Sequence, residues 1–129
     1  MQLAEVINEF GRYIGAKSLE MNENGVIHMT INKIGDLFID AKYQDESREH
    51  IFIYLMRVYE HFDGDLYRRA MELCDYQPNQ DYYANPVLHK DQVIGFVVKL
   101  HLDDFNLNAL RAIVSYLKDL QDRLEQQRA

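Results

Sequence analysis

The amino-acid sequence predicts an α+β fold, in which a mostly antiparallel, twisted sheet has helices packed on it. Two observations lead to this prediction. Apolar residues at helical spacing are confined to the start, a short middle segment and the end of the chain, and runs rich in β-branched and aromatic residues lie between them. The resulting order is α-β-β-β-α-β-β-α. With 129 residues and no linker or repeat, the chain is expected to form one domain, 1–129.

The first helix is expected to span about residues 2 to 14. Apolar residues recur there at gaps of three and four, which places them on one face of the helix. Gly15 follows the last of them and is a natural stop. The members of this stripe are Leu3, Val6, Ile7, Phe10 and Ile14.

Three strands are predicted next. The turn sequence Asn-Glu-Asn-Gly at 22–25 precedes a β-branched run at 26–31. A second turn, at 33–36, leads into a strand at 37–39, and the third strand spans 51–59. Both faces of this third strand are apolar, which indicates a central or sandwiched position in the sheet.

A short helix and a hairpin follow. Asp-Gly-Asp at 63–65 ends the third strand and offers an N-cap for a helix over 66–75. Residues 76–86, which contain both prolines, are predicted to form a loop. The hairpin consists of a strand at 87–89, a short turn and a longer strand at 94–102.

The last segment is a long helix that Asp104 or Asn106 can cap. Its apolar seam has spacings of 3, 4, 3 and 4 but covers barely two heptads, whereas a sustained coiled coil needs three or four. We therefore expect the seam to pack on the sheet of its own domain. It consists of Leu110, Ile113, Leu117, Leu120 and Leu124.

The charge balance excludes several classes of partner. The 14 Lys and Arg residues stand against 21 Asp and Glu, a formal net charge of −7, so neither nucleic acid nor an anionic membrane is an expected partner. No apolar run approaches the roughly 18 residues that span a membrane, and no signal peptide opens the chain. A single cysteine excludes an internal disulfide. Together these features predict a soluble, acidic protein of the reducing cytoplasm.

No catalytic, cofactor or metal site is predicted. Residues 11–18 have neither the spacing nor the preceding strand of a phosphate loop. His89 and His101 could meet across the hairpin, but a zinc site needs three or four ligands. Cys74 lies among the apolar positions of the short helix and is expected to be a small buried hydrophobe rather than a nucleophile.

The chain has more apolar surface than one sheet and three helices are expected to cover. Both end helices carry a full apolar stripe, and the strand at 51–59 is apolar on both sides. Tyr76, Tyr82 and Tyr83 cluster around the proline loop, either as interface residues or as the rim of the sheet. Apolar surface that stays uncovered implies a protein partner.

This element order, together with the size and acidity of the chain, resembles the class I type III secretion chaperones, the Tir-chaperone (CesT-like) family. Three segments carry the resemblance. Residues 3–15 are similar to the family's first helix, 22–31 to its first turn and strand, and 95–102 with the leucine-lined helix to its last strand and helix. One departure is that the family's Leu-Leu-x-x-Asn-like segment is replaced at 71–76 by Met-Glu-Leu-Cys-Asp-Tyr, without the Asn.

The resemblance implies a homodimer without enzymatic activity or a cofactor. Proteins of this family bind the N-terminal segment of a secreted effector in extended form and keep it competent for export. The alternative is a regulatory, YbjN-like protein of the same fold that binds another folded protein.

We expect the first helix and the first strands to form the client surface, with Leu3 and Val6 partly open and Ile7, Phe10 and Ile14 nearer the core. The dimer is expected to use the short helix and the late strand. The predicted client-binding residues are Leu3, Val6, Ile7, Phe10, Ile27, Met29 and Ile31, and the predicted dimer residues are Leu66, Ala70, Leu73, Phe96 and Val98.

Overall fold

Three α-helices and a six-stranded sheet follow one another in the predicted order, with two short additions, β1 and a 3-10 turn. The computed structural model describes residues 3–14, 20–21, 26–31, 34–40, 50–60, 64–75, 81–90 and 92–127. The α+β class is confirmed. The elements are α1 (Leu3–Ile14), β1 (Glu20–Met21), β2 (Val26–Ile31), β3 (Gly35–Asp40), β4 (His50–Val58), α2 (Gly64–Leu73), β5 (Ala84–His89), β6 (Val93–His101), η1 (Leu102–Asp104) and α3 (Leu107–Gln127).

The sheet is antiparallel throughout, with the strand order β1-β2-β3-β4-β6-β5. β4 lies between β3 and β6, which confirms the central position that its two apolar faces predicted. Lys90, in the turn between β5 and β6, has a positive φ of 52°. Among the strands of the described ranges, β5 lies at the edge of the sheet and pairs with β6 alone.

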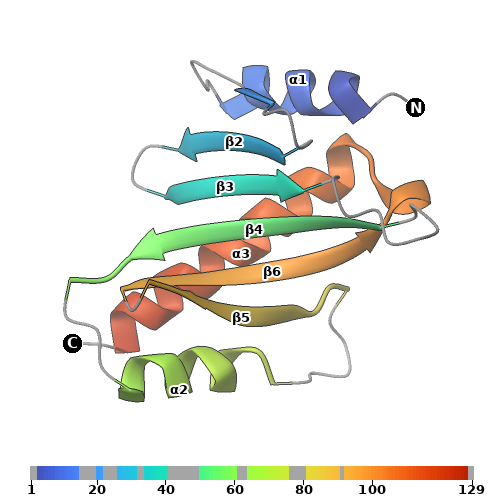
Figure 1. Ribbon diagram of the computed structural model, residues 1–129. Helices are drawn as coiled ribbons and strands as arrows, with labels where there is room; N and C mark the ends of the chain where they lie inside the picture. The colour runs from blue at the N-terminus through green and yellow to red at the C-terminus, as the bar shows by residue number, and fades with distance from the viewer. Residues whose placement is uncertain are drawn as a thin grey trace.

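The helices occupy one face of the sheet and its two edges. Figure 1 shows α3 running behind the sheet, α1 beside the β2 edge and α2 beside the β5 edge. α3 contacts β4, β6 and both other helices. No described helix lies over the front face of the sheet in this view. None of the described helices is both long and apolar enough to cross a membrane.

The core forms between α3 and the sheet face turned toward it. Side chains of a strand alternate between faces, so Ile51, Ile53 and Leu55 of β4 point toward α3 and are fully buried. The predicted α3 seam packs against them, which confirms that it belongs to its own domain. Its five members, Leu110, Ile113, Leu117, Leu120 and Leu124, are all at most 2% exposed.

The predicted loop at 76–86 was wrong at its end. β5 begins at Ala84, so Pro86 lies inside a strand and not in a loop, where it pairs with Phe96. Proline is tolerated on an edge strand because the missing N–H can face away from the ladder. Of the two caps predicted for α3, Asn106 is confirmed, since its Oδ1 accepts a hydrogen bond of 2.8 Å from the Ala109 N–H. The predicted turn at 22–25 and the stop at Gly15 lie outside the described residues.

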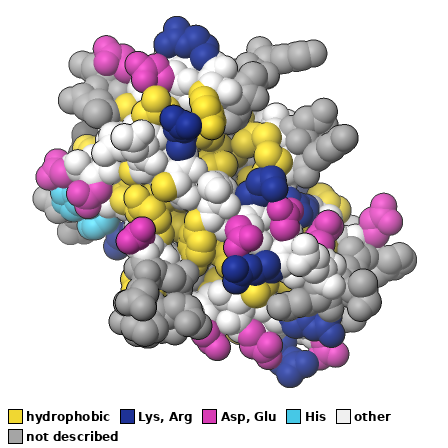
Figure 2. All heavy atoms as spheres, turned by 180° about the vertical axis from the view of Figure 1, so that it is seen from behind, with side chains coloured by type: hydrophobic (Ala, Val, Ile, Leu, Met, Phe, Trp, Pro, Cys, Tyr) yellow, Lys and Arg dark blue, Asp and Glu magenta, His cyan; other side chains and the backbone are white. Residues whose placement is uncertain are grey.

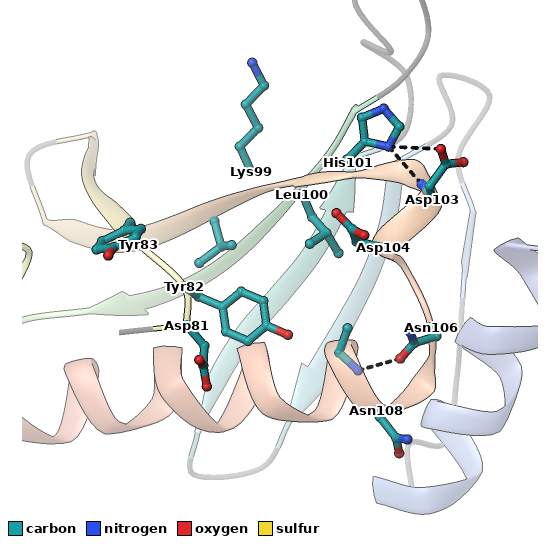
Figure 3. Close-up of a pocket in the computed structure, with 12 residues that line it drawn as sticks. Asp81, Tyr82, Tyr83, Lys99, Leu100, His101, Asp103, Asp104, Asn106 and Asn108 are labelled. Carbon is teal, nitrogen blue, oxygen red and sulfur yellow. Dashed lines mark hydrogen bonds and ion pairs between the residues drawn. The ribbon is translucent and has the colours of Figure 1, made fainter. Parts of the chain in front are cut away.

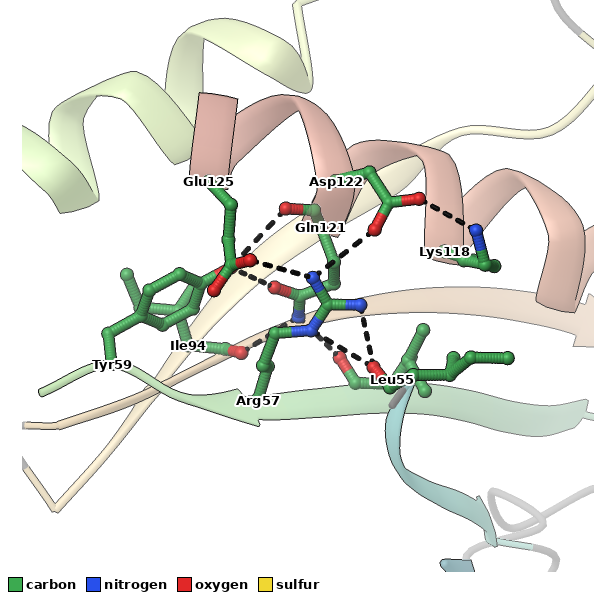
Figure 4. Close-up of polar contacts among 9 residues, drawn as sticks. Leu55, Arg57, Tyr59, Ile94, Lys118, Gln121, Asp122 and Glu125 are labelled. Carbon is green, nitrogen blue, oxygen red and sulfur yellow. Dashed lines mark hydrogen bonds and ion pairs between the residues drawn. The ribbon is translucent and has the colours of Figure 1, made fainter. Parts of the chain in front are cut away.

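A buried polar cluster fixes the C-terminal half of α3 on the sheet (Figure 4). Gln121 is 0% exposed, and its Nε2 donates hydrogen bonds to the carbonyl oxygens of Leu55 (3.0 Å) and Ile94 (2.9 Å). Beside it, Arg57 donates to the Ile34 carbonyl at 2.7 Å and contacts Asp122 at 3.3 Å. These contacts fix the position of α3 along β4 and β6.

Candidate protein-interaction surface

The face of the sheet opposite α3 carries a continuous set of apolar side chains that stay partly accessible. They come from four adjacent strands, β3, β4, β6 and β5. All are half-buried except Val58, which is 60% exposed. An apolar patch of this extent marks an interaction site more often than an ordinary surface. We call it the open face; it comprises Phe38, Phe52, Tyr54, Met56, Val58, Val87, Val93 and Val97.

The strand register sets these side chains in rows across the sheet. Phe38 lies opposite Tyr54, and Tyr54 lies opposite Val97. In the next row Met56 is paired with Gly95, and a Cβ added to Gly95 would overlap the Met56 thioether. The missing side chain at Gly95 therefore lets Met56 lie across β6. A shallow groove of about 480 Å³ runs over these rows and is lined by Tyr54 and Met56 among others.

Charged and polar side chains surround the apolar centre. Asp36 Oδ1 lies 3.1 Å from His28 Nε2 and accepts a hydrogen bond of 3.0 Å from the Thr30 hydroxyl. The His28 ring stacks on Phe38, with centroids 4.5 Å apart. An apolar centre with a polar rim is the usual composition of a protein interface.

A second charged group lies beside Phe52. Asp40 of β3 and Lys99 of β6 are its two register partners, and Lys99 Nζ lies 5.9 Å from the centroid of the Phe52 ring.

Burial, and then the Asp40 charge, raise the pKa of Tyr54 above its usual value of 10.0. Tyr54 therefore stays neutral at physiological pH and can be buried against a partner without a charge penalty.

Most of the predicted client residues lie in the protomer's own core. Val6, expected to be partly open, is only 4% exposed, because the whole described part of the α1 stripe packs inward. Ile31 alone among the described members remains half-accessible, and the side chain of Leu3 lies outside the described set. The buried members are Val6, Ile7, Phe10, Ile27 and Met29.

The predicted dimer residues are also mostly internal. Leu66, Ala70, Phe96 and Val98 are at most 2% exposed and so have no side-chain area left for a partner, while Leu73 is partly buried. Strand alternation explains this burial on β6: Phe96 and Val98 point toward α3, and the residues between and before them point to the open face.

The other hollows are more polar. One of them, about 700 Å³, lies between the start of β5, the end of β6 and the N-terminus of α3 (Figure 3). Asp81, Asp103 and Asp104 line it together with Tyr82 and Tyr83. No group of three metal-ligating side chains occurs among the residues that the structure describes.

One expected side-chain contact, that of His101 with His89, does not form. His101 meets His50 of β4, with ring centroids 5.4 Å apart, and not His89, which pairs with Val93. Cys74 is half-buried, and burial, followed by the charge of Asp75, raises the pKa of its thiol to about 11. A thiol with so high a pKa is a poor nucleophile, in agreement with the sequence interpretation.

The side of the molecule that carries α3 has a different character. Figure 2 shows acidic and basic side chains interspersed over its hydrophobic area. Two i, i+4 ion pairs lie along α3, Lys118 with Asp122 at 2.7 Å and Arg123 with Asp119 at 3.0 Å. Arg111 of α3 stacks on the exposed Tyr13, with its guanidinium carbon 3.9 Å from the centroid of the tyrosine ring.

Comparison with known proteins relates this chain to secretion chaperones by structure alone. No family model matches it, and no curated protein matches its sequence. The Yersinia pestis type III secretion chaperone SycH, solved with a fragment of YscM2, is similar over 97% of this chain and 98% of its own, with 18% identity and a TM-score of 0.65. The HopA1–SchA chaperone–effector complex matches over 95% of this chain and 90% of its own, with 13% identity and a TM-score of 0.60. The chain therefore has the secretion-chaperone fold that its sequence predicted.

Proposed function

We propose that this chain is a non-enzymatic cytoplasmic chaperone that binds the N-terminal segment of a type III secreted effector in extended form and keeps it competent for export. The observation that carries this proposal is the match in fold, over nearly the full length of both chains, to a secretion chaperone solved with a bound fragment. The accessible apolar surface described above supports it, since a chaperone needs such surface and most monomeric enzymes do not.

An extended client has two kinds of site to use. One is an apolar surface, on which alternate client side chains can lie. The other is the outer edge of β5, which has β6 as its one sheet neighbour among the described strands. A client strand added at this edge would gain main-chain hydrogen bonds, although Pro86 offers it no N–H.

The part of the predicted client surface that is still accessible lies at the β2–β3 end. Ile31 and Ile34 are half-buried there and line a groove of about 360 Å³ with Thr30 and Arg57. We propose this groove as the first client contact, in place of the buried stripe of α1. We also propose that two copies of the chain associate, so that each client meets two equivalent surfaces.

The test is co-expression of this chain with N-terminal segments of the type III effectors of the organism that encodes it. Complex formation with one such segment, unchanged after ATP depletion, is the expected result. The folded C-terminal remainder of the same effector is the control and should not bind. Binding to that folded part alone would favour the regulatory alternative, and no binding to any effector segment would contradict the chaperone.

A groove variant sharpens this test. Ile31→Glu places a carboxylate in the proposed client groove at a half-accessible position and should reduce recovery of the segment at least about tenfold. Asn8→Glu introduces the same charge at an exposed position of α1 that does not line this groove, and as the control it should leave recovery unchanged.

A further inference from the structure

We infer that Arg57 is a positioning residue of the client groove: it holds the backbone at Ile34 in place, so that the groove already has its shape when a client side chain enters. The inference rests on the proposed function and names the residue that shapes its first contact. The client groove is the one at the β2–β3 end of the sheet that Ile31, Ile34, Thr30 and Arg57 line among others.

The Arg57 side chain links the groove to α3. It is nearly enclosed, with 12% of its area exposed, and its Nε and Nη2 atoms both donate to the Ile34 carbonyl oxygen, at 3.0 and 2.7 Å. Its Nη1 atom donates to Asp122 Oδ1 at 3.3 Å and lies 3.8 Å from Glu125 Oε2 (Figure 4). The planar fork of an arginine can make all of these contacts at once, whereas a lysine offers a single nitrogen. Arg57 therefore connects the backbone just before β3 to the C-terminal end of α3.

The local backbone explains why this link is needed. The Ile34 N–H donates to the Ile31 carbonyl oxygen at 3.0 Å. Gly35 follows with a φ of 137°, and a Cβ there would meet the Met56 carbonyl oxygen at 2.5 Å. Glycine thus lets the chain lie close against β4, within reach of Arg57, but it restricts the backbone less than any other residue. The two hydrogen bonds from Arg57 supply the restriction that Gly35 does not.

The other end of the link is an ionised carboxylate on α3. Lys118 first, and then Arg57, lower the pKa of Asp122 through hydrogen bonds and charge, against the opposite effect of burial. Asp122 therefore carries its charge at neutral pH and pairs with both cations. Asp122 does not itself line the client groove. A change at Asp122 can thus reach a client in the groove only through Arg57.

A groove that is already shaped favours binding. Ile31 and Ile34 are the two apolar side chains among the residues that line it. If the backbone at Ile34 were loose, a client would have to order it on binding, and that ordering costs conformational entropy. Loss of the link should therefore weaken client binding in a chain that remains folded.

Asp122→Ala and Lys118→Ala form a matched pair. Both remove the ion pair between these two residues, but only Asp122→Ala also releases Arg57 from α3. The Kd for the N-terminal effector segment recovered by co-expression should rise about fivefold in Asp122→Ala and stay native in Lys118→Ala. Isothermal titration calorimetry measures both values. Both side chains are partly exposed, so both variants should keep the native circular dichroism spectrum. Equal affinity in the two variants would overturn the inference.

Arg57→Lys tests the hydrogen bonds to Ile34. It keeps the charge but not the fork, so the Kd should rise about tenfold and the Ile34 amide should exchange its hydrogen about tenfold faster. Asn106→Ala controls for a general loss of stability, because it removes the cap at the opposite end of α3 and should leave both readouts native. Weaker binding with native exchange at Ile34 would show that Arg57 acts on the client directly, which would overturn the positioning role.

The same titrations separate this inference from the chaperone proposal. If the native chain and Arg57→Lys bound the effector segment equally well, the positioning role would be overturned and the chaperone proposal would stand. If the native chain bound no effector segment, both would be contradicted.

Discussion

Tyr59 donates its phenolic hydrogen to Gln121 Oε1 across the interface between the end of β4 and α3, at 2.5 Å. Both side chains are fully buried. Since Gln121 also donates to the carbonyl oxygens of Leu55 and Ile94, one amide satisfies polar groups of three other residues. No buried side-chain nitrogen or oxygen among the described residues is left without a hydrogen-bond partner. The hydrogen bond between Tyr59 and Gln121 fixes the position of α3 along the sheet. Apolar packing is not directional, so by itself it would allow the helix to shift along β4.

Gln121→Leu tests the weight of this cluster. The substitution keeps the approximate volume but removes the hydrogen bonds of the buried amide to the Tyr59 hydroxyl and to two carbonyl oxygens, so we expect a loss of about 3 kcal/mol in the free energy of unfolding. Tyr59→Phe removes the hydroxyl that donates to Gln121 but leaves the amide's bonds to both carbonyl oxygens, and it should cost about 1 kcal/mol. Urea denaturation of both variants measures the difference. Equal stability of Gln121→Leu and the native chain would show that the buried amide contributes nothing.

Leu117→Ala tests the packing of α3 on the sheet. Leu117 is 0% exposed, so its truncation should cost about 2–5 kcal/mol. Ser115→Ala, on the exposed side of the same helix, is the control and should stay within about 0.5 kcal/mol of the native value. If Leu117→Ala melted like the native protein, the leucine seam would belong to a partner and not to this core.

Val6→Asp decides the role of α1. Because Val6 is buried, the new carboxylate has no water and no described partner, and we expect at least about 4 kcal/mol of destabilisation or loss of the folded state. Asn8→Asp introduces the same charge at an exposed position of α1 and should melt like the native chain. Circular dichroism on heating measures both. If the Val6→Asp variant folded and melted at the native temperature, Val6 would line an open client groove and would not belong to the core.

The Cys74 thiol provides a pH test. With a pKa of about 11, raised from 9.0, its thiolate fraction at pH 8 is roughly 100-fold below that of an ordinary cysteine, so alkylation in the folded chain should be slower by about that factor. The same thiol in urea is the control. Because the folded pKa exceeds the unfolded one, the contribution of this group to stability is full below pH 9 and is lost as the pH rises through 11. Rapid labelling of the folded chain at pH 8 would contradict this burial.

The fold was largely predictable because its signals are local. The helical spacing in α3, the β-branched run of β2 and the two apolar faces of β4 each follow from a few neighbouring residues. Pro86 misled the prediction for β5 because proline is compatible with a strand only at an edge, and edge positions are set by the whole topology.

The sequence predicted that an apolar interaction surface exists, but not which residues form it. The sequence indicated surplus apolar surface, and the apolar residues on both sides of β4 were its clearest sign. Which side of β6 faces α3 depends on a register that a one-residue shift inverts, so Phe96 and Val98 were chosen where Val97 lies on the open face. Gln121 was missed because nothing local distinguishes a buried glutamine from the exposed polar residues around it.

Light scattering of the chain purified with an effector N-terminal segment tests the central claim most directly. The account predicts a complex containing two copies of the 15.3 kDa chain and one segment, formed without ATP. If the chain were purified without any effector segment after co-expression with each of them, the account would be contradicted.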